Sequence, residues 1–265
     1  MRAWLPLLAG GLSAGMVAGL FGVGGGFLFV AVLVFGAQLR QAQAHATALV
    51  AVALAASAAG FRFGIDDAIV WPGALALAAG AIAGARLGSR YMPRISESAL
   101  LLLLVVVLAI LSIRFLLVGG VGGSQAGSEV VVLDLWLVAA HLLGGLFAGV
   151  LSSLTGAGGG FVYVPLLVVA FGYQQHVAEG TSLGAVVPTA LAGATGHHRH
   201  GYTDWAVGSR LGLGSILGGL AGAQIALALP ADVLARLFGV FQAILAVLFW
   251  RRRTRRAKPH GEVAD

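Results

Sequence analysis

Two glycine-rich stretches are the first residues of this chain whose type and spacing could support chemistry. The glycines are Gly24, Gly25 and Gly26 in the first stretch and Gly158, Gly159 and Gly160 in the second. Glycine tolerates positive φ and lets a backbone approach a ligand closely. If a short helix begins after each stretch, its exposed N–H groups and its dipole form an anion site. Tight packing between helices is the alternative use of such small residues.

Hydroxyl side chains follow both stretches at the same distance. Thr47 follows the first, and Thr181 with Ser182 follows the second. Because both positions carry threonine, we expect these hydroxyls to donate hydrogen bonds to a bound anion. The alternative is that each hydroxyl bonds a carbonyl of the preceding helical turn.

Ionisable residues occupy equivalent positions near the two stretches. His45 and Glu179 match, and either could exchange a proton during transport if it lies within a membrane. Placement in solvated loops is the alternative. Arg86 lies within an apolar run, where it could attract the anion or snorkel to the membrane interface. Gln224 stands at the position that the sequence comparison matches to Arg86.

The composition determines which elements position these residues. Hydrophobic residues make up 59% of the chain and charged residues 10%, which excludes a soluble globular domain. Long apolar runs predict an all-α polytopic membrane protein rather than an outer-membrane barrel. Six basic residues between Arg251 and Lys258 follow the last apolar run. Such a cluster predicts a cytoplasmic end near anionic lipid, not a nucleic-acid partner.

The chain reads as an internal duplication at a shift of 134 residues, from Gly24 to Gly158. Ten apolar segments follow one another: 3–21, 27–36, 46–60, 68–91, 98–118, 132–153, 160–171, 182–196, 205–229 and 233–250. A spanning helix needs about 20 residues, so segments 27–36 and 160–171 are expected to be broken or re-entrant helices. We therefore expect 8–10 membrane segments in two repeats, 1–118 and 132–250, with a linker at 119–131 and a tail at 251–265.

Five segments per repeat would place the second repeat upside down. The positive-inside rule supports this topology, because Arg2, Arg40 and Arg90 then fall on the same side as the basic C-terminus, although Arg62 and Arg236 do not. A parallel duplication with four crossings per half is the alternative. Inverted repeats with helices broken at matching positions are typical of secondary transporters.

The duplicated Gly-Xaa-Gly-Gly-Gly-Phe element resembles that of the TauE/SafE sulfite exporters, also called the TSUP or DUF81 family. The resemblance covers nearly the whole chain and includes Val164-Pro165 after the second copy; the first copy departs, with Ala31 in place of Pro165. The resemblance implies an inner-membrane carrier, in prokaryotes, of small sulfur-containing anions such as sulfite, sulfonates, sulfoacetate or thiosulfate.

The residues thus favour a transporter over an enzyme. We find no His-Glu-Xaa-Xaa-His, Gly-Xaa-Ser-Xaa-Gly or nucleotide-binding motif in the sequence, and we expect no catalytic residue, metal or cofactor. The expected partners are the anion, the lipid bilayer and a coupling proton, with an oligomer left open. A passive anion channel with a glycine-rich filter is the alternative function.

Overall fold

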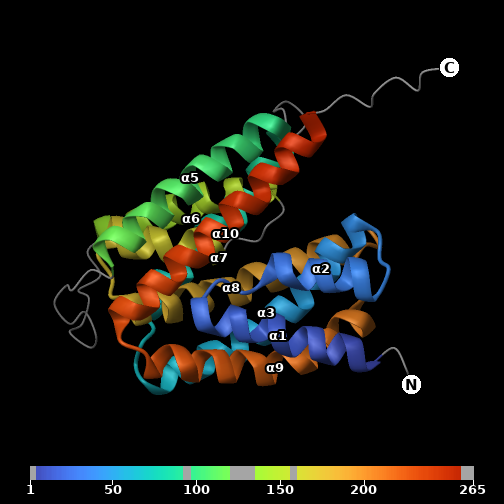
Figure 1. Ribbon diagram of the computed structural model, residues 1–265, viewed down its shortest axis with the longest axis horizontal. Coiled ribbons are helices and arrows are strands. Elements are labelled where there is room, and N and C mark those ends of the chain that lie inside the picture. Colours follow the sequence, from blue (N-terminus) through green and yellow to red (C-terminus); the bar gives the residue numbers. More distant parts are fainter. Residues whose placement is uncertain (1–3, 92–96, 120–134, 156–159, 258–265) are drawn as a thin grey trace.

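The structure is a computed structural model that describes residues 4–91, 97–119, 135–155 and 160–257. These residues form helices joined by turns, and no strand occurs among them (Figure 1). The helices are α1 (Trp4–Phe21), α2 (Gly26–Gly36), α3 (Gln41–Ile65), α4 (Trp71–Tyr91), α5 (Glu97–Val118), α6 (Leu135–Thr155), α7 (Gly160–Pro165), η2 (Leu166–Ala170), α8 (Gln175–His198), α9 (Trp205–Ala228) and α10 (Ala231–Ala257). The element η2 is a π-helical continuation of α7.

The predicted all-α membrane architecture is confirmed. Six helices are long and apolar enough to cross a bilayer, namely α1, α3, α5, α6, α9 and α10. The helices α4 and α8 have 21 and 24 residues and are not among these six. The two segments expected to be too short form α2 and the α7–η2 pair, Gly160–Ala170. The chain is therefore a multi-pass membrane protein with two sub-spanning helices.

Some helix boundaries differ from the predicted segments. Both α3 and α8 begin earlier, at Gln41 and Gln175, because an extended residue precedes each and the polar first turn is helical. At the other end, α10 continues to Ala257 and includes the basic residues from Arg251 onward. Except for Gly119, the predicted linker lies outside the described residues.

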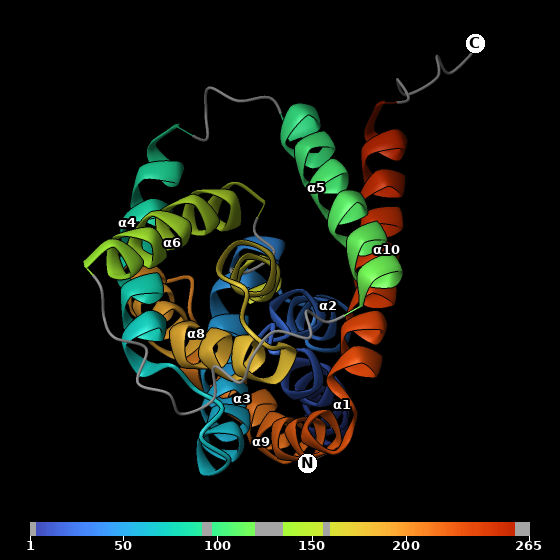
Figure 2. The same cartoon turned by 90° about the vertical axis from the view of Figure 1, so that its left-hand side faces the viewer.

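Helices from the two halves of the sequence pack against each other, and we call α1, α4, α6 and α9 the exchanged helices. The longest interfaces join α1 to α9 and α6 to α4, so the first helix of each half lies against the fourth helix of the other. Figure 2 shows α4 beside α6 and α5 beside α10, with α3 and α8 between these pairs. The helices that carry the candidate residues, α3 and α8, contact each other at the centre.

Glycines at four-residue spacing allow the exchanged helices to approach closely. They are Gly11, Gly15 and Gly19 on α1, Gly214, Gly218 and Gly222 on α9, Gly80 and Gly84 on α4, and Gly145 and Gly149 on α6. A Cβ atom at any of these positions would clash with a backbone carbonyl of the partner helix. Small residues on one face are the usual means of close packing between membrane helices.

These glycine contacts occur twice at the offset by which the sequence repeats. Gly218 lies against the Leu12 carbonyl of α1, and Gly84 lies against the Leu146 carbonyl of α6. This register pairs Gly84 with Gly218. The sequence comparison, which matches Arg86 with Gln224, pairs Gly84 with Gly222 instead, one helical turn further along α9. The position equivalent to Arg86 is therefore Leu220, and the expected match with Gln224 is wrong.

Two buried threonines hold the starts of the exchanged helices. The Thr47 hydroxyl of α3 accepts a hydrogen bond from the Asp204 N–H, 3.1 Å away and immediately before α9. The Thr181 hydroxyl of α8 accepts one from the Val70 N–H, 3.0 Å away and immediately before α4. Orphan N–H groups at a helix start need such acceptors. Each central helix therefore fixes the first turn of a helix from the other half.

Replacement of an interface glycine is expected to separate two helices. Gly218→Ala should lower the free energy of unfolding by about 1 to 3 kcal/mol, because the new methyl group meets the Leu12 carbonyl. Gly196→Ala on α8 is the control, since no atom lies within 4 Å of its Cβ position and alanine favours a helix by up to about 1 kcal/mol. Thermal unfolding in detergent measures both; equal effects would contradict the packing role.

Removal of a threonine hydroxyl is expected to leave a buried N–H without its acceptor. Thr181→Val should destabilise the protein by about 1 to 3 kcal/mol, since the Val70 N–H loses its hydrogen bond. Thr195→Val is the control, because that hydroxyl bonds only carbonyls of its own helix. A Thr181→Val protein as stable as the control in a denaturation series would refute this role.

Candidate functional site

The first glycine-rich stretch breaks the chain between α1 and α2. We call Gly22–Gly25 the first break. Gly22, Gly24 and Gly25 have φ values of 64°, 71° and 66°, in the left-handed region that glycine adopts without strain. Gly25 also lacks room for a side chain, because a Cβ atom would lie 2.9 Å from the Ala14 carbonyl oxygen. The half-helix predicted to follow the first break begins at Gly26.

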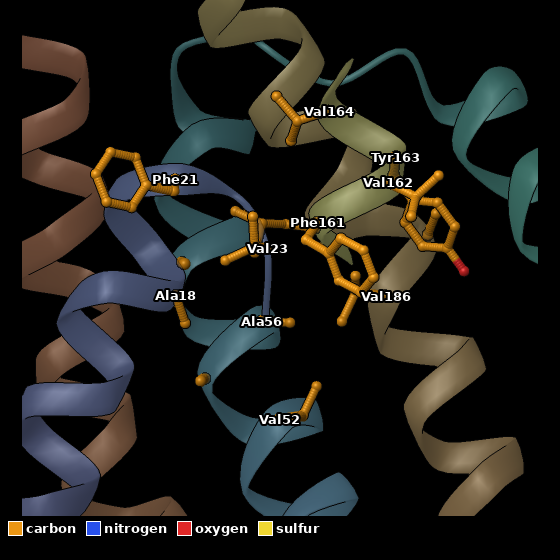
Figure 3. Packing of buried hydrophobic residues seen from close by; sticks show 14 of the residues in the cluster. Ala18, Phe21, Val23, Val52, Ala56, Phe161, Val162, Tyr163, Val164 and Val186 are labelled. Carbon is orange, nitrogen blue, oxygen red and sulfur yellow. The ribbon is translucent and has the colours of Figure 1, made fainter. Parts of the chain in front are cut away.

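The second glycine-rich stretch meets the first in space. Gly158 and Gly159 lie outside the described residues, but Gly160 begins α7 and is buried. A Cβ atom at Gly160 would clash with the carbonyl oxygen of Val23 in the first break. In Figure 3, Val23 and Phe161 belong to one buried cluster with Val52 of α3. The structure thus brings both predicted half-helices to one interior point.

Helix α8 holds the first break in place. The Ser182 hydroxyl donates a 2.7 Å hydrogen bond to the Gly22 carbonyl. A Cβ atom at Gly22 would lie only 2.7 Å from the Cα atom of Glu179, so the break rests directly on this part of α8. Ser182 was predicted to bind the substrate. In this structure its hydroxyl group donates its hydrogen bond to the first break, so Ser182 positions the break.

Glu179 is buried at the contact between α8 and the first break. Its side chain has no solvent-exposed surface, and the Gln175 amide donates a 2.8 Å hydrogen bond to its Oε1. Its Oε2 and the Gln175 Oε1 have no hydrogen-bond partner among the described residues. The alternative of a solvated loop is wrong for Glu179. An uncompensated carboxylate in such surroundings is costly, which favours the neutral, protonated acid.

Gln175 is a functional candidate that the sequence analysis missed. It lies one helical turn before Glu179 and is fully buried. The i, i+4 spacing of the two side chains was visible in the sequence, but it is informative only if α8 begins at Gln175. Because the apolar run starts later, the polar residues before it resembled a loop.

His45 differs from Glu179 in its surroundings. Both lie within the first turns of their helices, but His45 is half-buried and Glu179 is fully buried. Gln41, which precedes His45 as Gln175 precedes Glu179, is exposed. The two ionisable positions that the sequence treats as equivalent therefore lie in unequal environments.

Arg86 is not brought to the breaks. It is exposed, close to the end of α4 at Tyr91, whereas the residues around the first break are buried. This placement favours the interfacial alternative for its side chain.

A pocket of about 360 Å³ opens where α3 begins and α8 turns into α9. Gln43, His198 and Asp204 are among its lining residues. Asp204 is also the residue whose N–H bonds Thr47, so Thr47 lies next to this pocket on the interior side. The pocket therefore lies beside the start of α3, one of the two central helices.

The arrangement can bind an anion through backbone groups. The Gly25 carbonyl accepts hydrogen bonds from Leu28 and Phe29, as in the first turn of a helix. The N–H groups earlier in that turn have no intrahelical acceptor, and they carry the positive end of the helix dipole. Glu179, on which the break rests, is an ionisable group in contact with this part of the chain.

The comparisons with known proteins identify a family of membrane transporters. Residues 1–115 and 141–264 match the family model described as "Sulfite exporter TauE/SafE". A "Probable membrane transporter protein YdhB" of Bacillus subtilis is 33% identical over 100 residues, which cover 38% of this chain and 41% of that protein. No solved structure matches the chain.

Longer matches occur in two strains of Xylella fastidiosa, Temecula1 and 9a5c. Each contains a "Probable membrane transporter protein" that is 30% identical over 184 residues, which cover 68% of this chain and 69% of the relative. Since the family model extends over most of both halves, the chain belongs to the TauE/SafE sulfite exporter family.

Proposed function

We propose that this protein is a secondary carrier that exports small sulfur-containing anions, such as sulfite, sulfonates, sulfoacetate or thiosulfate, across the inner membrane. The family description supports export of sulfite, and the names of the relatives support membrane transport without naming a cargo. The observation that carries the proposal is the contact of Gly160 with the Val23 carbonyl, which joins the two helix breaks inside the protein. Breaks that meet in the interior are typical of substrate sites in transporters.

The anion would bind to backbone N–H groups at the starts of the two short helices. Gly24, Gly25 and Gly26 supply the first set, and Gly158, Gly159 and Gly160 the second. Thr47 and Thr181 support this site through the helices α9 and α4, whose starts they hold. Arg86, at the exposed surface, would attract the anion before it reaches the breaks.

Alternating access would come from movement of one repeat against the other. The glycine contacts that occur twice at the same offset support two equivalent units, which we propose to be inverted. The central helices α3 and α8 would carry the coupling groups His45 and Glu179 and would change their exposure during the cycle. The basic end of α10 would lie on the cytoplasmic side.

Direct binding tests the cargo. We expect at least one of sulfite, thiosulfate, sulfoacetate and taurine to raise the unfolding temperature of the purified protein in detergent, since a ligand that binds only the folded state stabilises it. Flux of the same anion into liposomes should saturate at carrier rates. If no anion stabilises the protein and none crosses the membrane, the proposed function is wrong. Unitary currents would identify a channel instead.

A serine pair tests whether the first break forms the site. Ser182→Ala should weaken anion affinity roughly fivefold, the equivalent of about 1 kcal/mol for one hydrogen bond, because the Gly22 carbonyl loses its donor. Ser112→Ala is the matched control, since that buried hydroxyl donates to the Gly239 carbonyl between α5 and α10. Isothermal titration of both variants gives the comparison; equal affinities would place the anion elsewhere.

A further inference from the structure

Glu179 is coupled to the first break by direct contact. The break rests on the Cα and Cβ atoms of Glu179, at 2.7 Å and 2.8 Å from the Cβ position of Gly22. Ser182, less than one turn later, bonds the Gly22 carbonyl. The backbone segment that carries Glu179 is therefore in contact with the break that precedes α2, where the proposed anion site lies.

No described charged group compensates a negative charge on Glu179. The charged or titratable residues on the elements packed against α8 include His45 and Arg62 of α3, Arg86 of α4, Tyr163 of α7, and Asp232 and Arg236 of α10. Arg62 pairs with Asp66, and Arg236 pairs with Asp232. On α8 itself, His176 bonds the carbonyls of Ala226 and Leu229. None of these groups forms an ion pair or hydrogen bond with Glu179, whose one bond comes from the neutral Gln175 amide.

The orientation of the pair leaves one carboxyl oxygen for a proton. Gln175 occupies Oε1 through its amide N–H, and the buried Oε2 has no partner in the described part of the chain. A carboxylate at this position would repel an anion strongly, since few solvent molecules screen the two charges. A protonated carboxyl group removes that repulsion.

We infer that the first break accepts an anion only when Glu179 is protonated, so that one proton and one anion are carried together in the same direction. This inference rests on the proposed function and specifies its coupling as symport rather than exchange, so that the outward concentration gradient of the anion, and not the proton gradient, would drive export. In the binding step, Glu179 Oε2 gains a proton from water and the anion enters at the break; release reverses both events. Linkage requires that anion binding tightens proton binding by the same factor.

The pH dependence of anion affinity tests the inference. The probes are thiosulfate and sulfoacetate, whose charges are constant between mildly acidic and mildly alkaline solution. For the wild-type protein we expect affinity to fall about tenfold or more as the pH rises across this range, because Glu179 loses its proton. Glu179→Gln mimics the protonated acid and should keep the high affinity at every pH.

Two further variants separate Glu179 from other titratable groups. Asp67→Asn removes an exposed carboxylate in the turn after α3, at a φ of 53° that asparagine also tolerates, and should retain the pH dependence of the wild type. His45→Gln removes the other group proposed for coupling and shows how much of the pH dependence Glu179 accounts for alone. Loss of the pH dependence in His45→Gln but not in Glu179→Gln would overturn the inference and assign the coupling to His45.

Transport in liposomes tests the direction of coupling. An inwardly directed proton gradient should drive thiosulfate or sulfoacetate accumulation by the wild type, and Glu179→Gln should only equilibrate the anion. Accumulation driven by an outwardly directed proton gradient would overturn symport. If Glu179→Gln does not fold, proton uptake by the wild type on anion addition, followed with a pH indicator in weak buffer, decides the question.

The outcomes separate this inference from the proposed function. Anion binding that is independent of pH in the wild type would refute the inference and leave the anion site intact. The absence of binding by both probes and by sulfite at every pH would refute the anion site on which both proposals rest.

Discussion

The fold depends on the close approach of backbones, which glycine alone permits. Helices α1 and α9, and likewise α4 and α6, lie so near each other that a single methyl group at Gly218 or Gly84 would meet a partner carbonyl. The same constraint operates at the first break, where Gly22 rests on the backbone of α8. Because apolar lipid provides little hydrophobic drive for helix association, such close packing supplies much of the attraction between these helices.

The central helices α3 and α8 hold other elements of the fold in place. Through Thr47 and Thr181, α3 and α8 hold the starts of helices from the opposite halves, and α8 also holds the first break through Ser182. Glu179 lies at the same contact between α8 and the first break. A movement of α8 would therefore be transmitted to the break, to α4 and to the buried acid together.

Membership in the TauE/SafE family and the geometry address different questions. The family match over residues 1–115 and 141–264 indicates what class of protein this is, and the relatives carry names of membrane transporters. The geometry shows which residues meet around the first break and that a buried acid lies beside it. The two agree because the duplicated glycine motif, which carries the resemblance, is also the part of the chain that forms the interior contact.

The sequence by itself determined the helical architecture, the two sub-spanning helices and the family, because apolar run length and glycine content are local properties. It did not determine the helix register between the halves: Arg86 was matched one turn away from its true equivalent, since several glycines recur every four residues. Nor did it reveal the buried Gln175–Glu179 pair or the roles of Ser182 and Thr181 as holders of backbone groups. Only the tertiary structure decided these points, because burial and hydrogen-bond partners depend on which distant helix packs against each residue.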